Sequence, residues 1–309
     1  MKTILVCFIF LLGSAVVFGQ PNDVPTDWQA GDVWTYELKK REATRWQERD
    51  EKSLIVFELK ITGSKPGKAG SYEAEWRYLS INTLPDENKY DSCLNLVRKF
   101  LLHTPLRLSF SKDGGFEGWT DLPGLRIALL ATQGLSNHQK RSDDCFYMQD
   151  FIRKSQGDSS DFLSGYVPEV KQFFKSLMLL SEDSHLTRDT VTVMENELAG
   201  RMEIPKTINR VVRTSAAGYE VSLNTALSPA AFKQFKTAGF EKAWIEMGLP
   251  VESMATAKAR LEAFQPQRKE TMLAVFEKPN GVMKRFVYQY DEYVSPMEDD
   301  LLVYEFVRK

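Results

Sequence analysis

The chain has little of what catalytic and cofactor sites usually require. Its three histidines, His103, His138 and His185, have no second histidine at the spacing of a helical zinc site, and no His-Glu-x-x-His motif is present. A nucleophile elbow, a Walker loop and a dinucleotide fingerprint are all absent from the sequence. No acidic run has the alternating oxygen ligands of a calcium loop. We therefore expect no cofactor and no bound metal, and a non-catalytic protein is favoured over an enzyme.

An excess of one charge is also missing. The chain has 40 basic and 42 acidic residues, a formal charge of −2. This near balance gives no electrostatic reason to bind nucleic acid or anionic lipid. The densest apolar patch of the later sequence, residues 177–180, is far too short to cross a bilayer. We expect no nucleic-acid partner and no transmembrane segment in the mature chain.

The one long apolar run lies at the start. Lys2 precedes the apolar residues 4–12, small residues follow, and 17–19 place small or aliphatic side chains where a signal peptidase reads. The run that ends at Phe18 is shorter than the roughly 20 residues of a membrane-spanning helix. We expect residues 1–19 to be a signal peptide cleaved after Gly19, which makes the mature chain secreted or periplasmic.

Cysteine is scarce. Cys7 leaves with the expected signal peptide, so Cys93 and Cys145 are the cysteines of the mature chain. In an oxidising compartment they could form one intramolecular disulfide that closes a loop of about 50 residues. The alternative is two free thiols that lie too far apart to bond.

Alternation of apolar and charged residues is the clearest pattern present. Residues 55–61 and 72–78 each place apolar side chains on one face, and a glycine-rich connector between them predicts an antiparallel hairpin. Further hairpins are predicted at three turns, 113–115, 216–218 and the Pro-Asn-Gly turn 279–281. Residues 301–307 are expected to form a last strand. Short turns between successive strands indicate an antiparallel meander.

Helices are predicted among the strands. Residues 168–182 carry apolar side chains at spacings of three and four, which indicates an amphipathic helix. Ser228 is expected to cap a helix that has Pro229 in its first position and turns Phe232 and Phe235 inward. Another helix is expected after Pro250.

These elements predict an α+β fold, in which amphipathic helices pack on one face of a long, curved antiparallel sheet, a meander or half-barrel. The mature chain 20–309 is expected to be a single domain. A faint repeat of strand, turn, strand and helix leaves a second arrangement open, with halves 20–190 and 191–309.

Aromatic and aliphatic side chains gather on the predicted faces of the sheet and of helix 168–182. They could line an apolar cavity covered by helices, or they could form an ordinary core. The residues that we predict to line a ligand cavity are Trp76, Tyr78, Phe173, Leu177, Phe286, Tyr288 and Tyr290.

The segment 28–36, Trp-Gln-Ala-Gly-Asp-Val-Trp-Thr-Tyr, and the turn 112–115, Lys-Asp-Gly-Gly, stand within a run of long strands and helices. This layout resembles uncharacterised secreted bacterial proteins and, more distantly, the half-barrel carriers of the LolA and LppX type. The resemblance implies acyl chains held between a curved sheet and helices. It concerns architecture, and residues 131–200 have no counterpart, so no binding residue is carried over.

Three functions follow as expectations. The first is a carrier of an apolar, lipid-like small molecule. The second is a structural or interaction module that binds another envelope protein. The third is a hydrolase, because paired carboxylates from distant strands leave no local spacing in a sequence. Ligand identity and oligomeric state are left open.

Overall fold

The computed structural model describes most of the chain from Trp28 onward. The described residues are 28–44, 49–64, 70–84, 100–112, 114–121, 124–125, 167–179, 185–196, 200–278, 281–295 and 298–309. The expected signal peptide 1–19 and both Cys93 and Cys145 lie outside these residues.

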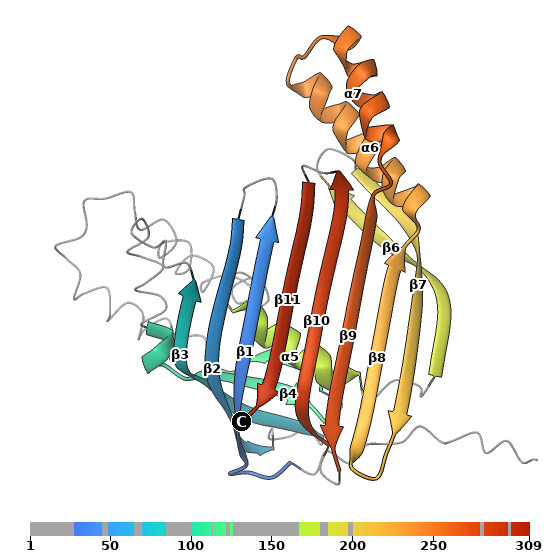
Figure 1. Ribbon diagram of the computed structural model, residues 1–309. Coiled ribbons are helices and arrows are strands. Elements are labelled where there is room, and N and C mark those ends of the chain that lie inside the picture. The colour runs from blue at the N-terminus through green and yellow to red at the C-terminus, as the bar shows by residue number, and fades with distance from the viewer. Residues whose placement is uncertain are drawn as a thin grey trace, which may run out of the picture.

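One large open antiparallel sheet dominates the described structure (Figure 1). Its eleven strands lie in the spatial order β5-β4-β3-β2-β1-β11-β10-β9-β8-β7-β6. The strands are β1 (Val33–Thr44), β2 (Arg49–Ser64), β3 (Ser71–Leu84), β4 (Leu106–Ser111), β5 (Phe116–Trp119), β6 (His185–Asn196), β7 (Gly200–Thr214), β8 (Gly218–Leu227), β9 (Gln267–Glu277), β10 (Val282–Ser295) and β11 (Glu298–Arg308). The fold is therefore mostly β, and the expected α+β class describes it only roughly.

The sheet consists of two meanders joined by the first and last strands. Successive strands pair antiparallel, which confirms the four predicted hairpins. β1 pairs with β2 on one side and with β11 on the other, so that Leu38 lies opposite both Ile55 and Phe306. This pairing of chain ends places the middle of the sheet where β1 and β11 meet.

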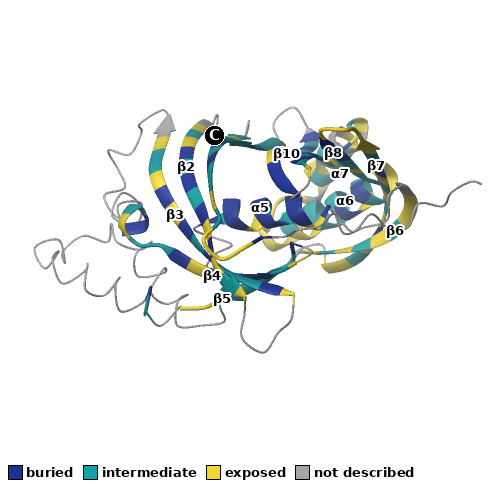
Figure 2. Cartoon of the chain, turned by 90° about the horizontal axis from the view of Figure 1, so that it is seen from below, coloured by how far each residue is buried: buried dark blue, intermediate teal, exposed yellow. Residues whose placement is uncertain are grey.

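Alternating burial along the strands makes the sheet two-faced. In β2, Phe57, Leu59 and Ile61 are buried, whereas Glu58 and Lys60 between them are more exposed. The sheet curves (Figure 2), and rings of its buried residues contact Phe173 within the concave side. The predicted two-residue period is confirmed, because successive side chains of a strand point to opposite faces.

Helix α5 (Pro168–Met178) lies within this concave side and is enclosed by the sheet (Figure 2). Its residues Val170, Phe173, Phe174 and Leu177 are buried at spacings of three and four, which confirms the predicted amphipathic face. The helix ends at Met178, four residues before the predicted end. The guanidinium of buried Arg210 on β7 donates a hydrogen bond to the Leu179 carbonyl just beyond the helix, where a cation also complements the helix dipole.

Helices α6 (Pro229–Glu246) and α7 (Val251–Ala263) form a hairpin that projects beyond the ends of the strands (Figure 1). Phe232 and Phe235 of α6 are buried against Ile204 and Leu227, as the sequence predicts for the two phenylalanines. Ser228 is the N-cap residue and Pro229 follows it in the first turn, as predicted, but within segment 200–278 the Ser228 side chain makes no capping hydrogen bond. The Ser228 carbonyl accepts from the Phe232 N–H, and its own backbone N–H donates to the Pro205 carbonyl.

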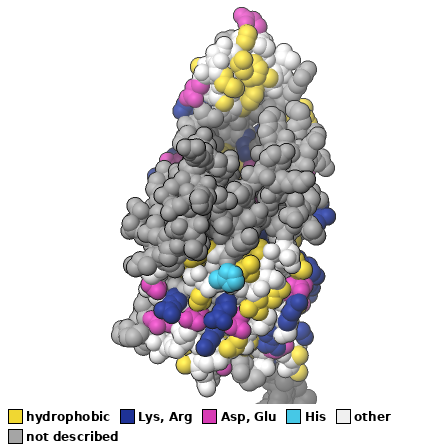
Figure 3. Space-filling view, turned by 90° about the vertical axis from the view of Figure 1, so that its left-hand side faces the viewer, with side chains coloured by type: hydrophobic (Ala, Val, Ile, Leu, Met, Phe, Trp, Pro, Cys, Tyr) yellow, Lys and Arg dark blue, Asp and Glu magenta, His cyan; other side chains and the backbone are white. Residues whose placement is uncertain are grey.

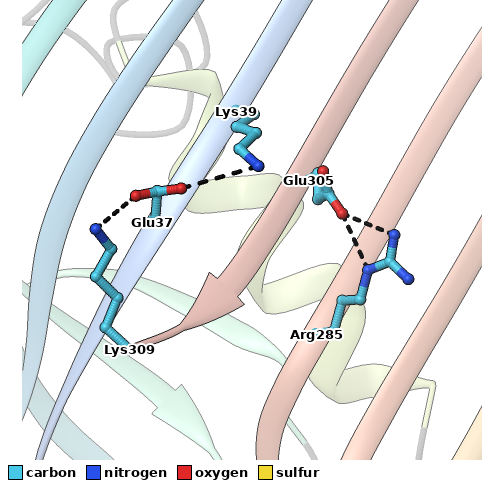
Figure 4. Close-up of polar contacts among 5 residues, drawn as sticks. All are labelled: Glu37, Lys39, Arg285, Glu305 and Lys309. Atoms are coloured by element: carbon cyan, nitrogen blue, oxygen red, sulfur yellow. Dashed lines mark hydrogen bonds and ion pairs between the residues drawn. The ribbon is translucent and has the colours of Figure 1, made fainter.

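The convex face carries cross-strand ion pairs (Figure 4). Lys309 Nζ lies 2.5 Å from a carboxylate oxygen of Glu37, and the Arg285 guanidinium lies 2.7 Å from Glu305. These side chains are partly or largely exposed, and ion pairs in water contribute little stability. The convex face is thus a solvated surface, and the apolar packing lies on the other side.

Candidate functional site

The seven residues predicted to line a ligand cavity all lie on the concave side. Trp76 and Tyr78 belong to β3, Phe173 and Leu177 belong to α5, and three aromatics belong to β10. Six of the seven are at most 4% exposed, and Tyr290 is partly buried. The structure therefore brings residues that are distant in sequence together around α5.

In this structure these side chains pack closely against one another. The rings of Phe57 and Trp76 are stacked with centroids 3.7 Å apart. Phe173 meets Trp76 edge to face at 5.4 Å and Phe306 at 5.7 Å. Aromatic pairs at such distances are favourable beyond their buried area. The predicted role of the seven residues in ligand binding stays a prediction, and their packing makes them part of the core around α5.

A buried polar contact borders this aromatic cluster. Tyr78 Oη donates a hydrogen bond of 2.5 Å to Glu169 Oε1 in the first turn of α5. Burial raises the pKa of the Glu169 carboxyl, and the hydrogen bond from Tyr78 offsets part of that effect. Burial also raises the pKa of the Tyr78 hydroxyl, and the neighbouring Glu169 raises it further. Both groups therefore favour their protonated forms.

Near the last turn of α5 the concave face becomes more polar. The Lys175 ammonium lies 5.2 Å from the centre of the Tyr288 ring, and burial lowers the pKa of this lysine. Burial raises the pKa of Tyr288 to about 12, and the charge of Glu270 raises it further. Hydroxyl and charged groups therefore border the apolar cluster in space.

A cavity of about 260 Å³ lies on this polar part of the sheet, over β6, β7, β8 and β9. Hydroxyl, apolar and charged side chains line it together. The lining residues are Thr192, Val193, Met194, Glu195, Lys206, Thr225, Leu227, Arg268 and Glu270. Lys206 is half-buried here, and it has no ion-pair partner among the residues that the structure describes. We take this cavity, the β6–β9 pocket, as the candidate site.

The second cation of the β6–β9 pocket is held by acidic neighbours. The Arg268 guanidinium lies 3.9 Å from Glu270 and 3.9 Å from Glu292, and it stands 5.0 Å from the centre of the Tyr290 ring. These contacts offset its charge and fix its position. Lys206 is therefore the cation of the pocket whose charge is left for a ligand.

The β6–β9 pocket is not among the sites predicted from the sequence. Its residues come from four strands, and each strand supplies one to four of them. The sequence did contain one signal. Residues 206, 208 and 210 occupy alternate positions of one strand, so Lys206 and Arg210 lie on the same face of it. That both fall on the concave side is decided by strand pairing, which spacing alone does not reveal.

A cavity of about 300 Å³ adjoins the β6–β9 pocket where β8 leads into α6, and Lys206, Leu227 and Arg268 line both. Another cavity, of about 190 Å³, lies between β4, β5 and Leu125. Among the described residues, no helix is long and apolar enough to cross a membrane, and no group of three or more His, Cys, Asp or Glu side chains could hold a metal ion.

No protein-family model matches this chain, and no curated protein matches it significantly. Among solved structures, the chain is similar to one described as lipid–protein interactions in lipovitellin, with a TM-score of 0.42 and 9% sequence identity. The match covers 92% of this chain and 25% of the lipovitellin chain, so this chain spans about a quarter of that length. Nothing about the ligands or partners of this chain follows from a likeness of that degree.

Proposed function

We propose that the protein is a non-catalytic binding or carrier protein for a small amphiphile, and that the β6–β9 pocket holds the acidic head group of this ligand. The supporting observation is Lys206, a half-buried cation without an ion-pair partner among the described residues, placed between hydroxyl and apolar side chains. A buried or half-buried charge is stabilised when an opposite charge pairs with it. An anion in the pocket would supply that charge.

The surroundings of Lys206 support both parts of such a ligand. Thr192 and Thr225 add hydroxyl donors for the head group. Leu227 and Met194 give an apolar wall that continues into the cluster of Ile204 and Phe232 beneath α6. A few convergent polar groups next to an apolar wall are typical of small-molecule sites.

The size of the pocket favours a small ligand. Its volume of about 260 Å³ lies just below the range of roughly 300–1,000 Å³ that is usual for ligand pockets. A single short acyl chain with a carboxylate is the simplest compound of this chemistry and size. We further propose that this binding takes place outside the cytoplasm, because the sequence begins with the pattern of a signal peptide.

Calorimetric titration with lauric acid and with dodecanol tests the proposal. The two probes share a chain length and differ in charge, so the Lys206→Gln variant should weaken laurate binding by at least about tenfold and leave dodecanol binding nearly unchanged, since hydrogen bonds to charged groups are the stronger ones. Lys284→Gln, on the exposed surface of β10, is the matched control and should bind both probes as the wild type does. Equal laurate affinity in the Lys206→Gln variant and the wild type would exclude this site.

A second candidate function rests on the edge of the sheet. β6 is its last strand among the described residues, and Val191 and Val193 of this strand are 51% and 45% exposed. A long edge strand with apolar side chains can pair with a strand of another protein. We propose β6 as the contact of an interaction module. Val191→Lys should abolish capture of a partner protein, whereas Leu79→Lys, at a similar exposure on β3, should not.

A further inference from the structure

The tip of the α6–α7 hairpin exposes large apolar side chains. Ile245 and Met247 are 65% exposed and Leu249 is 39% exposed; Ile245 lies in the last turn of α6, and the other two lie in the connection to α7. A space-filling view shows hydrophobic side chains gathered at this end of the molecule (Figure 3). We call Ile245, Met247 and Leu249 the apolar tip. Leaving three such side chains in water costs free energy that contact with an apolar phase would recover.

The apolar tip stands at the far end of a projecting element. Figure 1 shows the hairpin extending beyond the strands, so the tip is the part of it farthest from the sheet. Ten residues separate buried Phe235 from Ile245, which corresponds to about 15 Å of helix. The tip can therefore meet a surface that the sheet itself does not touch.

Aromatic rings support the hairpin just below the tip. Phe240 and Trp244 are one turn apart on α6, with ring centroids 5.4 Å apart. Trp244 Nε1 donates a hydrogen bond of 3.0 Å to the Pro250 carbonyl across the turn. Tryptophan is enriched among side chains that lie at the boundary between water and lipid.

The backbone of the tip is already hydrogen-bonded within the hairpin. The Met247 N–H donates to the Ala243 carbonyl, the Gly248 N–H to Ile245 and the Leu249 N–H to Trp244. Pro250 has no N–H, and its carbonyl accepts from Trp244, from the Ser253 N–H and from the Ser253 hydroxyl. Gly248 makes this closed turn with a φ of +65°. Such internal pairing is what a backbone needs before it can leave water for an apolar phase.

Charge and area decide which partner fits. From Trp244 to Glu252 the charged residues are Glu246, whose carboxylate lies 3.9 Å from Lys242, and exposed Glu252 in the first turn of α7. Three side chains on a convex tip offer far less than the roughly 800 Å² per partner of a stable protein interface. A lipid layer needs no complementary shape, and a helix pair can enter it by about 5–10 Å.

We propose that the apolar tip inserts into the interfacial layer of a lipid bilayer and so docks the protein on a membrane surface. The tip presents no net cationic patch that would attract anionic lipid, so we propose zwitterionic lipid as its partner. The inference does not depend on the ligand proposed for the β6–β9 pocket, which lies on the sheet at the other end of the hairpin.

Co-sedimentation of the purified protein with phosphatidylcholine vesicles tests this proposal. The variant Ile245→Ser/Met247→Ser/Leu249→Ser should lose at least about tenfold in vesicle partitioning, because three apolar side chains no longer enter lipid. The matched control, Val33→Ser/Leu54→Ser/Leu79→Ser, removes three exposed apolar side chains of the strands and should partition as the wild type does. Equal loss in both variants, or no loss in the tip variant, would overturn the proposal.

Fluorescence gives a second measurement. Vesicles whose acyl chains carry bromine near the head group should quench part of the tryptophan emission of the wild type, and Trp244→Phe should remove that quenching while leaving sedimentation nearly intact. Failure of the wild type to sediment with vesicles, or quenching that persists in Trp244→Phe, would overturn insertion through this tip. A tip variant that keeps its laurate affinity while losing vesicle binding separates this inference from the proposed function.

Discussion

Tyr78 and Glu169 form a hydrogen-bonded pair of 2.5 Å inside the core and thereby join β3 to the first turn of α5. Tyr78 is 1% exposed and Glu169 is 6% exposed. Glu169 belongs to the apolar underside of a helix, where Tyr78 donates to its carboxyl. Burial outweighs the hydrogen bonds that this carboxyl accepts, so its pKa lies above the ordinary value and it keeps its proton more strongly than it does in water.

The wild type should lose stability as the pH rises because Glu169 is buried, and the Glu169→Gln variant should not show this loss. In the unfolded chain this carboxyl ionises near its ordinary pKa of 4.5, whereas burial raises its pKa in the folded protein. The unfolded state therefore releases the proton first, and the free energy of unfolding of the wild type falls as the pH rises from 4.5 through the raised pKa. Urea denaturation over a pH series should show the variant gaining on the wild type across that window.

Below pH 4.5 the carboxyl is neutral in both states, so the difference between the two proteins should there be constant. Tyr78→Phe is the companion variant. It removes the hydrogen bond that lowers the pKa of Glu169, so the window should extend to higher pH. A difference between wild type and Glu169→Gln that is flat from acid to neutral pH would show that Glu169 has no raised pKa.

Phe173→Ala should be the most damaging substitution in α5. The Phe173 ring contacts rings of four strands, including Tyr36 at 5.0 Å and Trp76 at 5.4 Å, and it is 1% exposed. We expect the free energy of unfolding to fall by about 4 kcal/mol, as is usual when a buried phenylalanine is removed and leaves a cavity. Chemical denaturation measures this loss.

Lys171→Ala is the control for that substitution. Lys171 is exposed on the same helix, so its loss should change stability by less than about 0.5 kcal/mol. If Phe173→Ala cost no more than Lys171→Ala, the packing of α5 against the concave face would not be a source of stability.

The strands could be predicted from the sequence because a strand with one buried face alternates apolar and polar residues with a period of two. Tyr72, Ala74, Trp76 and Tyr78 alternate with charged or polar residues, and all four lie on the concave side. Tight turns next to such runs then fix hairpin partners. The amphipathic face of α5 could be predicted for the same reason, with a period near four.

The remaining features depend on contacts between distant segments. Nothing in residues 33–44 or 298–308 indicates that β1 and β11 pair, although this contact joins the two meanders. The β6–β9 pocket is likewise formed by strand order, which places Lys206 on β7 and Arg268 on β9, the two strands that flank β8. The apolar tip was not predicted because apolar side chains in a helical hairpin suggest burial, and only the projection of the hairpin leaves Ile245 and Met247 in solvent.

Gly114→Ala should destabilise the protein through a clash with α5. Gly114 lies in the turn between β4 and β5, and a Cβ there would come within 2.2 Å of Leu177 Cβ and 2.6 Å of the Leu177 carbonyl carbon. Because the second contact is with backbone, a side-chain rotation cannot relieve it. We expect a loss of about 3 kcal/mol or more, from overpacking together with the strain of a φ of +84°.

Gly200→Ala separates the two causes of that loss. Gly200 has a similar φ of +73°, but a Cβ there would meet nothing within 4 Å. Its loss should be about 1–2 kcal/mol, the cost of the left-handed backbone alone. Thermal or urea denaturation that gave equal losses for both variants would mean that the turn moves away from α5 at little cost.

Lys236→Met should loosen the attachment of the α6–α7 hairpin to the sheet. Lys236 Nζ on α6 lies 2.5 Å from Glu292 Oε1 on β10, and their side chains are 24% and 11% exposed. Burial alone would raise the pKa of Glu292, but hydrogen bonds from Lys236 and Tyr290 outweigh it and hold the pKa below its ordinary value. The pair therefore contributes stability above pH 4.5, and this contribution is lost as the pH falls through the lowered pKa.

At neutral pH we expect Lys236→Met to cost about 2 kcal/mol, because Glu292 then keeps only Tyr290 and an Arg268 guanidinium at 3.9 Å. Hydrogen exchange should accelerate first in α6, since the pair anchors that helix. Lys242→Met, whose pair with Glu246 is more than half exposed on both sides, should cost less than about 0.5 kcal/mol. Adding Glu292→Gln to Lys236→Met should recover part of the lost stability, because no unpaired carboxylate is then buried. A double variant that is less stable than Lys236→Met alone would mean that Glu292 is held mainly by Arg268 and Tyr290.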